Sequence, residues 1–495
     1  MITEQDIPTV RREPALKAVL VAVCLSLATV VSAVTSLNVA LPDLAKDTGA
    51  SQTQVSWIVD AYALVFASLL LAGGAIGDRY GRRRVLLIGL LLFGSGAAGA
   101  MATSDVTALI ALRGLLGVGA ALVMPATLST ITITFTDRAR TQAVAIWSGV
   151  AGASAVLGLV VSGSVLELWS WHAVFGLNVV LAVASLALVL RVVPESTSHE
   201  DGHLDVVGAV LFVVTLGTII FSIIEGPTAG WVSARTVGGL VGGGVLLIVA
   251  GWWEMRVTEP LLDPRLFRHR AFAAASLSIT FQFFAFFGFV FLLLQYLQIV
   301  AGLGSLPAAL CVLPIAVTLM PASRAAAGLV GKIGTRATCV AGLVLVTGGL
   351  LVLRELGTEL NYVVLVGGLL LLGLGMGLAM TPATAALTDA LPSDKQGVAS
   401  AMNDLARELG GALGIAVLGS VLTSSITDRL HGMPHGGGAS AADLPRLPGP
   451  VAALVRAAFV DGLQNALSLA AVVVAATAVL VAVLARPHRE APAQP

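Results

Sequence analysis

Three charged side chains stand close together within one long apolar stretch of this sequence. Asp404, Arg407 and Glu408 are spaced at i, i+3 and i+4, so a helix places them on neighbouring faces. Two acids beside one arginine neutralise it and leave one negative charge. Such a cluster can hold a proton or a cation and later release it. The alternative is a salt bridge that satisfies itself and only stabilises the helix.

Two further ionisable residues, Asp60 and Arg113, lie in other apolar stretches. A carboxylate removed from water accepts a proton more readily than one in solution, so we expect Asp60 to exchange protons and to compete with a cationic substrate. The alternative for Asp60 is an interfacial residue hydrated from outside. Gly114, Gly117 and Gly119 leave room for close neighbours around Arg113, which predicts its burial. The alternative for Arg113 is a purely structural partner of backbone carbonyls.

The composition of the chain indicates a protein that is largely surrounded by lipid. Of the 495 residues, 57% are hydrophobic and only 11% are charged, and the mean hydropathy is +0.94. A soluble protein of this size carries about one quarter charged residues, so most of this surface does not face water. Lys plus Arg and Asp plus Glu both number 28, which leaves no net charge to attract nucleic acid.

Sequence signatures of catalysis are missing from the chain. An ATP-driven pump needs a Walker loop, and Gly331-Lys332-Ile333 lacks the Ser or Thr of that motif. Neither HExxH nor GxSxG occurs, and the three cysteines have no metal-binding or disulfide spacing. We therefore expect no enzyme, no catalytic residues, no metal site and no cofactor.

The hydrophobic pattern predicts an all-α membrane protein. A helix needs about 20 mostly apolar residues to cross the hydrocarbon core of a bilayer. Fourteen stretches meet this requirement, and we expect transmembrane helices at 18–40, 55–76, 85–103, 107–133, 143–166, 172–191, 205–225, 236–254, 272–299, 306–329, 337–354, 361–386, 398–423 and 460–485.

The basic residues predict how these spans are oriented. An even number of spans leaves both termini on the same side of the membrane. With that side inside, nineteen of the 28 Lys and Arg residues lie in inner segments and six in outer segments. Lys and Arg are enriched in cytoplasmic loops. We therefore expect a multi-pass protein of the inner, cytoplasmic membrane with both termini in the cytoplasm.

One loop motif occurs twice in the chain, after the second and after the tenth expected span. The copies are 253 residues apart, and the matching pairs are Gly81 and Gly334, Arg79 and Lys332, and Arg83 and Arg336. A repeat at the same helix boundary indicates two homologous six-helix halves. We expect an N-terminal half at 1–192, an inserted helix pair at 193–258 and a C-terminal half at 259–495 with an outer loop at 424–459.

The first copy of the loop carries groups suited to a switch between helices. Its members are Gly74, Asp78, Arg79, Gly81, Arg82 and Arg83. Glycine lets helix ends turn tightly, and Asp78 can pair with an arginine or cap a neighbouring helix. The loop is then a charge latch that breaks and reforms as the halves rock. The alternative is only an anchor to the anionic inner leaflet.

Four segments together resemble one transporter family. GAIGDRYGRR, which is residues 74–83, resembles the hallmark loop of the major facilitator superfamily, and residues 109–120 resemble its buried-arginine motif. Residues 57–74 and 400–414 resemble the fourteen-helix drug:proton antiporters of the Emr/Qac type. The resemblance covers nearly the whole chain and implies two six-helix halves plus two inserted central helices.

The resemblance also implies a function. It implies proton-driven export of hydrophobic or amphipathic drugs, with Asp60 and the cluster at 404–408 serving proton and substrate. Arg113 is implied to couple proton movement to conformational change. We expect the partners to be a small-molecule substrate, protons and the lipid bilayer, with no nucleic acid and with the protein a monomer.

Two positions depart from the pattern of that family. The first span usually carries an aspartate where this chain has Ala33, which predicts fewer coupled protons. The fifth span usually contains Gly-Pro, and here Leu159 takes the place of the proline, which predicts a weaker kink. The small residues of span five remain and predict close packing on a neighbouring helix; they are Gly149, Gly152, Gly158 and Gly163.

Other functions are compatible with these residues. An exporter of a single endogenous metabolite or antibiotic, as in self-resistance, has the same polar core. A proton-coupled importer is also possible, because a fold does not determine direction. A membrane receptor that transports nothing belongs to a different class and predicts no substrate flux.

Overall fold

The computed structural model describes residues 13–50, 52–196, 205–258, 260–430 and 449–484, and all regular elements within these ranges are helices. In chain order they are α1 (Glu13–Thr48), α2 (Gln52–Tyr80), α3 (Arg82–Met101), α4 (Val106–Thr134), α5 (Asp137–Leu168), α6 (His172–Val192), α7 (Val206–Ala229), α8 (Ala234–Glu254), η1 (Pro264–Arg268), α9 (Arg270–Gln295), η2 (Tyr296–Val300), α10 (Ser305–Cys311), α11 (Leu313–Leu353), α12 (Tyr362–Asp389), η3 (Ser393–Lys395), α13 (Gln396–Leu430) and α14 (Gly449–Leu484).

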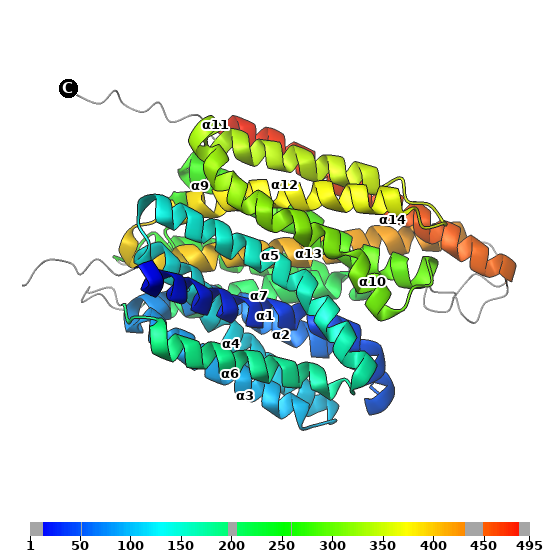
Figure 1. Cartoon of the computed structure of the whole chain (residues 1–495), viewed down its shortest axis with the longest axis horizontal. Coiled ribbons are helices and arrows are strands. Elements are labelled where there is room, and N and C mark those ends of the chain that lie inside the picture. The colour runs from blue at the N-terminus through cyan, green and yellow to red at the C-terminus, as the bar shows by residue number, and fades with distance from the viewer. Residues whose placement is uncertain (1–12, 51, 197–204, 259, 431–448, 485–495) are drawn as a thin grey trace, which may run out of the picture.

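The long helices lie side by side in one bundle, with α1–α6 gathered on one side and α9–α14 on the other (Figure 1). Within the first group α2 and α3 pack on α4, and α1 packs on α5 and α6; within the second α11 packs on α12, and α9 on α13. The groups meet mainly where α2 packs on α13 and α5 packs on α11, and also where α4 packs on α13 and α5 packs on α10 and α12. The helix α7 packs on both α2 and α13, and α8 packs on α7. The α7–α8 pair therefore lies against the junction of the groups.

Thirteen helical segments of the described chain are long and apolar enough to cross a membrane. One of them, Leu306–Leu353, has 48 residues. A continuous helix of that length measures about 70 Å, whereas the hydrocarbon core is about 30 Å thick. Its backbone leaves the helical conformation at Gly334, where φ is 81°. The segment thus covers the tenth and eleventh predicted spans, and the prediction of an all-α membrane protein is confirmed.

The glycines of the two loop copies have the same conformation. Gly81 between α2 and α3 has φ 105°, and Gly334 has φ 81°. Positive φ is open to glycine but unfavourable for residues with a Cβ atom. Both copies of the motif thus reverse the chain at glycine, at positions 253 residues apart.

Several helices extend beyond the predicted spans. Helical structure enters the predicted outer loop at 424–459 from both sides, because α13 continues to Leu430 and α14 begins at Gly449. Hydropathy marks only the part of a helix that lies in hydrocarbon, whereas backbone hydrogen bonding continues through polar residues outside it. Half of that loop, residues 431–448, lies outside the described residues.

The glycines of α5 do pack against neighbouring helices. A Cβ atom at Gly149 or Gly152 would touch Met320 or Leu319 of α11, and one at Gly163 would touch Leu306 of α10. Gly158 instead faces α1. Three of the four glycines therefore let α5 approach the second helix group. Leu159, at the position of the family's proline, is buried within an unbroken helix.

These contacts predict different effects for two alanine substitutions. A Cβ atom at Gly158 would lie 2.9 Å from the Cα atom and the carbonyl oxygen of Ser32, which cannot move alone. At Gly152 it meets only the flexible side chain of Leu319. We expect Gly158→Ala to destabilise the protein by about 1–3 kcal/mol and Gly152→Ala by less. Thermal unfolding of the purified variants measures this, and equal unfolding temperatures would contradict it.

Candidate functional site

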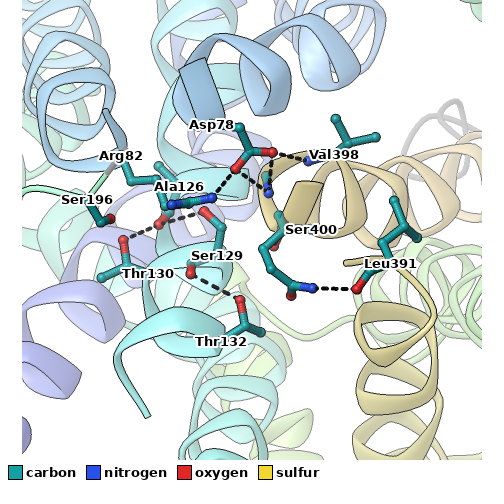
Figure 2. A network of polar contacts seen from close by, with 12 residues as sticks. Asp78, Arg82, Ala126, Ser129, Thr130, Thr132, Ser196, Leu391, Val398 and Ser400 are labelled. Atoms are coloured by element: carbon teal, nitrogen blue, oxygen red, sulfur yellow. Dashed lines mark hydrogen bonds and ion pairs between the residues drawn. The ribbon is translucent and has the colours of Figure 1, made fainter. Parts of the chain in front are cut away.

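The carboxylate of Asp78 joins the end of α2 to the start of α13 (Figure 2). The backbone N–H of Gly397 donates to both of its oxygens, at 2.8 and 2.7 Å, and the N–H of Val398 donates to Oδ2 at 3.2 Å. Its Oδ1 also pairs with the guanidinium of Arg82. The first backbone N–H groups of a helix lack partners within it and carry partial positive charge. Asp78 supplies both a hydrogen-bond acceptor and the matching charge.

Glycines allow the helix backbones to meet at this point. A Cβ atom at Gly74 would lie 2.7 Å from the carbonyl carbon of Gly397 and 2.8 Å from the Cβ atom of Ala401. A Cβ atom at Gly397 would lie 2.7 Å from the carboxylate of Asp78. We call Gly74, Asp78, Arg82 and Gly397 the α2–α13 clamp. Three of its members were predicted from the loop motif, and Gly397 was not.

The other loop residues lie beside the clamp. The guanidinium of Arg83 donates to the carbonyl oxygen of Leu190 at 2.7 Å, and its backbone N–H donates to Glu195 at 3.2 Å. A Cβ atom at Gly81 would also meet the Glu195 carboxylate. Arg79 is half-buried, with its guanidinium 5.8 Å from the ring centre of Tyr80. These contacts are made to α2, to α6 and to the residues just after α6. Among the loop residues, Asp78 and Gly74 are the ones whose described contacts extend to α13 in the second helix group.

A second contact between the groups lies near the clamp. The guanidinium of Arg140, in the first turn of α5, is 3.0 Å from the carboxylate of Asp389 at the end of α12. It also donates to Gln396 at 3.4 Å. The amide of Gln396 in turn donates to the carbonyl oxygens of Thr388, Leu391 and Pro392. The pair of Arg140 and Asp389 was not predicted, because both residues look like ordinary charges at helix ends.

Arg113 is buried in α4, as its glycine neighbours predict. Its side chain is 2% exposed, and its Nε donates to the carbonyl oxygen of Ile58 on α2 at 2.8 Å. The guanidinium carbon lies 4.5 Å from the ring centre of Tyr62, a cation–π contact. Tyr62 is itself 1% exposed, and its hydroxyl has no hydrogen-bond partner among the described residues.

Asp60 is half-buried on α2, between the first helix group and the α7–α8 pair. The charges that act on it are those of Glu225 on α7 and Arg113 on α4. Glu225 is paired with Arg235 of α8 at 3.2 Å. The inserted pair therefore places a second acid near Asp60, which no sequence motif indicated.

The three predicted residues of α13 lie together, and they do not satisfy one another. Arg407 approaches Asp404 with its Nη1 at 3.6 Å from Oδ1, which is too long for a hydrogen bond. Oδ2 of Asp404 and both Nε and Nη1 of Arg407 have no hydrogen-bond partner in the described chain. Unpaired buried polar atoms are costly. The ion pair of Arg407 with Asp404 therefore leaves buried polar atoms of both side chains without a hydrogen bond.

Aromatic side chains from other helices surround Arg407. Its guanidinium carbon lies 4.6 Å from the ring centre of Phe283 on α9 and 5.6 Å from that of Trp147 on α5. Asn403 donates to Asp404 at 3.2 Å and accepts from Thr384 of α12 at 2.9 Å. The cluster is therefore in contact with both helix groups through α5 and α13.

The polar residues of α2, α4 and α13 form one set at the junction of the groups. The charges that act on the Tyr62 hydroxyl are those of Arg113, which lies over its ring, and of Glu408 on α13. We call Asp60, Tyr62, Arg113, Asp404, Arg407 and Glu408 the central cluster. Tyr62 is the member that sequence reasoning missed, although its place two residues after Asp60 in an apolar helix was a usable signal.

Comparison with known proteins identifies the family. The Major Facilitator Superfamily matches residues 23–415, which is most of the chain. The chain belongs to this superfamily. The multidrug resistance protein Stp of Mycobacterium tuberculosis is 33% identical over 400 residues, covering 81% of this chain and 74% of that protein. The multidrug efflux pump LfrA of Mycolicibacterium smegmatis is 36% identical over 471 residues, covering 91% and 93%.

A solved structure shares the superfamily fold. The crystal structure of the human organic anion transporter MFSD10 (TETRAN) aligns with a TM-score of 0.66 at 17% sequence identity, covering 94% of this chain and 99% of that one. At this identity the likeness concerns the fold alone. The predicted resemblance to the major facilitator superfamily is thus confirmed both by sequence and by architecture.

Proposed function

We propose that this superfamily member exports hydrophobic or amphipathic compounds across the cytoplasmic membrane in exchange for protons. The observation that carries the proposal is the central cluster. It holds three carboxylates and two arginines at the junction of two helix groups, with buried polar atoms that lack partners among the described residues. Ionisable groups within a membrane are expensive and mark pathways of ions or substrates. Carboxylates that gain and lose protons there supply the coupling.

Both named relatives support the choice of substrate class. Stp is named a multidrug resistance protein and LfrA a multidrug efflux pump, and LfrA is matched over nearly its full length. For this chain the proposed partners are a small-molecule substrate, protons and the bilayer. The protein acts as a monomer, uses no cofactor and catalyses no reaction.

The helix groups are proposed to be the moving parts. They comprise an N-terminal half at 1–192 and a C-terminal half at 259–495, with the α7–α8 pair at 193–258 between them. Both termini lie in the cytoplasm, so the α2–α13 clamp closes the cytoplasmic side. Substrate then reaches the central cluster from inside when the clamp opens, and from outside when it is closed. Alternating access in this superfamily is a rocking of the two halves about a central site.

Transport of an amphipathic cation tests the proposal. Ethidium is loaded into cells that produce the chain and into cells that do not, and its efflux is followed by fluorescence. We expect faster efflux from producing cells and loss of the difference when an uncoupler dissipates the proton gradient. Everted membrane vesicles test the direction, since an exporter accumulates ethidium in them as protons leave. Efflux that persists with the uncoupler contradicts proton coupling.

The same vesicles distinguish the alternative functions. An importer accumulates substrate in right-side-out vesicles and not in everted ones. An exporter of a single metabolite transports its own substrate and none of a panel of unrelated dyes and antibiotics. A receptor shows no flux of any compound.

A further inference from the structure

Tyr62 is a buried polar residue to which the proposed exchange gives no role. Its side chain is 1% exposed, and its hydroxyl lacks a hydrogen-bond partner among the described residues. A buried hydroxyl without a partner is unfavourable by about 1–3 kcal/mol. Phenylalanine has the same ring without that cost. The hydroxyl is therefore expected to find its partner in another conformation of the protein.

The packing of α2 against α13 indicates which group that partner is. The two helices meet at Gly74 and Gly397 and extend away from this point side by side. Tyr62 is twelve residues from Gly74, and Glu408 is eleven residues from Gly397. At 1.5 Å per residue they lie about 18 and about 17 Å from the clamp, which is the same depth. Glu408 is half-buried, and it is the acid whose charge reaches the Tyr62 hydroxyl.

The guanidinium of Arg113 strengthens Tyr62 as a donor. It lies over the tyrosine ring at 4.5 Å and is held there by the carbonyl oxygen of Ile58. A positive charge over the ring withdraws electron density from the phenol, which makes the O–H a better donor to a carboxylate. Asp60 on α2 is the other charge near Arg113, and Arg407 and Asp404 are the charges that act on Glu408.

We infer that Tyr62 is a positioning residue whose hydroxyl donates a hydrogen bond to the ionised carboxylate of Glu408 as the two helix groups move. This inference rests on the proposed proton exchange. When Glu408 loses its proton to water, the Tyr62 O–H donates to a carboxylate oxygen and keeps its own proton. When Glu408 is protonated again, the bond weakens and α13 is free to move relative to α2. Tyr62 on α2 thus responds to the protonation state of Glu408 on α13, and this links the first helix group to the second.

The test compares pH profiles of ethidium transport in proteoliposomes that contain the full chain. Removing the hydroxyl by Tyr62→Phe destabilises ionised Glu408, so protons are released only at higher pH. We expect the pH of half-maximal transport to rise by about one unit, in keeping with the loss of a hydrogen bond to a charged group. Tyr296→Phe is the matched control. Tyr296 is equally buried, but its hydroxyl donates to the carbonyl oxygen of Gly357 at 2.8 Å, and its variant should keep the wild-type profile.

Further variants separate this role from a structural one. Glu408→Asp withdraws the carboxylate from the hydroxyl while keeping its charge, and it should raise the half-maximal pH as Tyr62→Phe does. If the Tyr62→Phe protein cannot be reconstituted into liposomes, the pH profile of Glu408→Asp tests the inference in its place. In a Glu408→Gln background, Tyr62→Phe should cause no further shift. A wild-type profile in both Tyr62→Phe and Glu408→Asp overturns the inference, and so does an undiminished shift in the Glu408→Gln background. Absence of pH-driven transport in the wild type instead overturns the proposed function.

Discussion

The substitution Asp60→Asn is expected to abolish proton-coupled efflux while leaving the protein in the membrane. Asparagine has nearly the shape of aspartate and can still form hydrogen bonds, but it cannot take up or release a proton. One proton that moves down about 100 mV supplies about 2.3 kcal/mol, which sustains a roughly 50-fold gradient of a neutral compound. If Asp60 carries one coupled proton, its loss lowers the steady-state gradient by up to that factor.

Everted vesicles measure this effect directly. Ethidium accumulation is compared for the wild type and for Asp60→Asn at equal amounts of protein in the membrane. Asp43→Asn is a matched control, because Asp43 is an exposed carboxylate in the last two turns of α1, the helix that precedes α2. Unchanged pH-driven accumulation in Asp60→Asn would falsify the role of this residue. The counterflow of labelled against unlabelled ethidium, which needs no proton gradient, should survive the substitution.

The alanine at position 33 makes proton coupling depend more strongly on Asp60. Ala33 is 1% exposed in α1, where the drug:proton antiporters usually carry an aspartate. With that acid missing, the acids of the central cluster that we propose to carry protons are Asp60, Asp404 and Glu408, and Glu225 of α7 acts on Asp60. Asp60→Asn therefore leaves fewer acids to compensate for its loss than it would in a relative with an acid in span one.

Local sequence pattern predicted the parts of the site that lie on one helix. The i, i+3 and i+4 spacing of Asp404, Arg407 and Glu408 is a property of any helix, so their proximity followed without a structure. The burial of Arg113 followed from its glycine neighbours. The transmembrane spans followed from hydropathy, because the bilayer sets both their length and their composition.

Contacts between helices that are far apart in the chain could not be predicted from local sequence pattern. Asp78 and Gly397 are 319 residues apart in the chain, and the motif around Asp78 indicated only that it would cap some helix. The contact of Tyr62 with Arg113 depends on how α2 and α4 pack, and the depth that Tyr62 shares with Glu408 depends on how α2 and α13 pack. Packing of this kind is fixed by many side chains at once rather than by a repeated spacing. The same holds for Arg140 and Asp389.

The substitution Asp78→Asn is expected to open the α2–α13 clamp. It keeps an oxygen that can accept from the N–H of Gly397, but it removes the negative charge that faces the N-terminus of α13 and the buried guanidinium of Arg82. A charge at a helix terminus in a partly buried site contributes up to about 2 kcal/mol. Losing it shifts the ratio of closed to open clamp by about 30-fold, and Arg82, 2% exposed, loses its carboxylate partner.

Cysteine labelling follows the clamp independently of transport. Ser400→Cys places a thiol of similar size in the first turns of α13, where Ser400 is fully buried. In a background with alanine at the three native cysteines, we expect Asp78→Asn to raise the rate of maleimide labelling at position 400 by about 30-fold and to slow uphill ethidium transport by about tenfold or more. Asp105→Asn is the matched control, since Asp105 caps its own helix α4 within one group.

Arg140→Gln gives the comparison that separates the clamp from its neighbour. The pair of Arg140 and Asp389 also joins the two helix groups, but both side chains are partly solvated, at 28% and 60% exposed. Solvated ion pairs contribute about 0.2–1 kcal/mol, so the labelling rate should rise less than fivefold. If Arg140→Gln opened position 400 as much as Asp78→Asn does, the buried carboxylate would not be the dominant latch. The expected order of effects follows from burial, because the same charge contributes more where water cannot replace its partner.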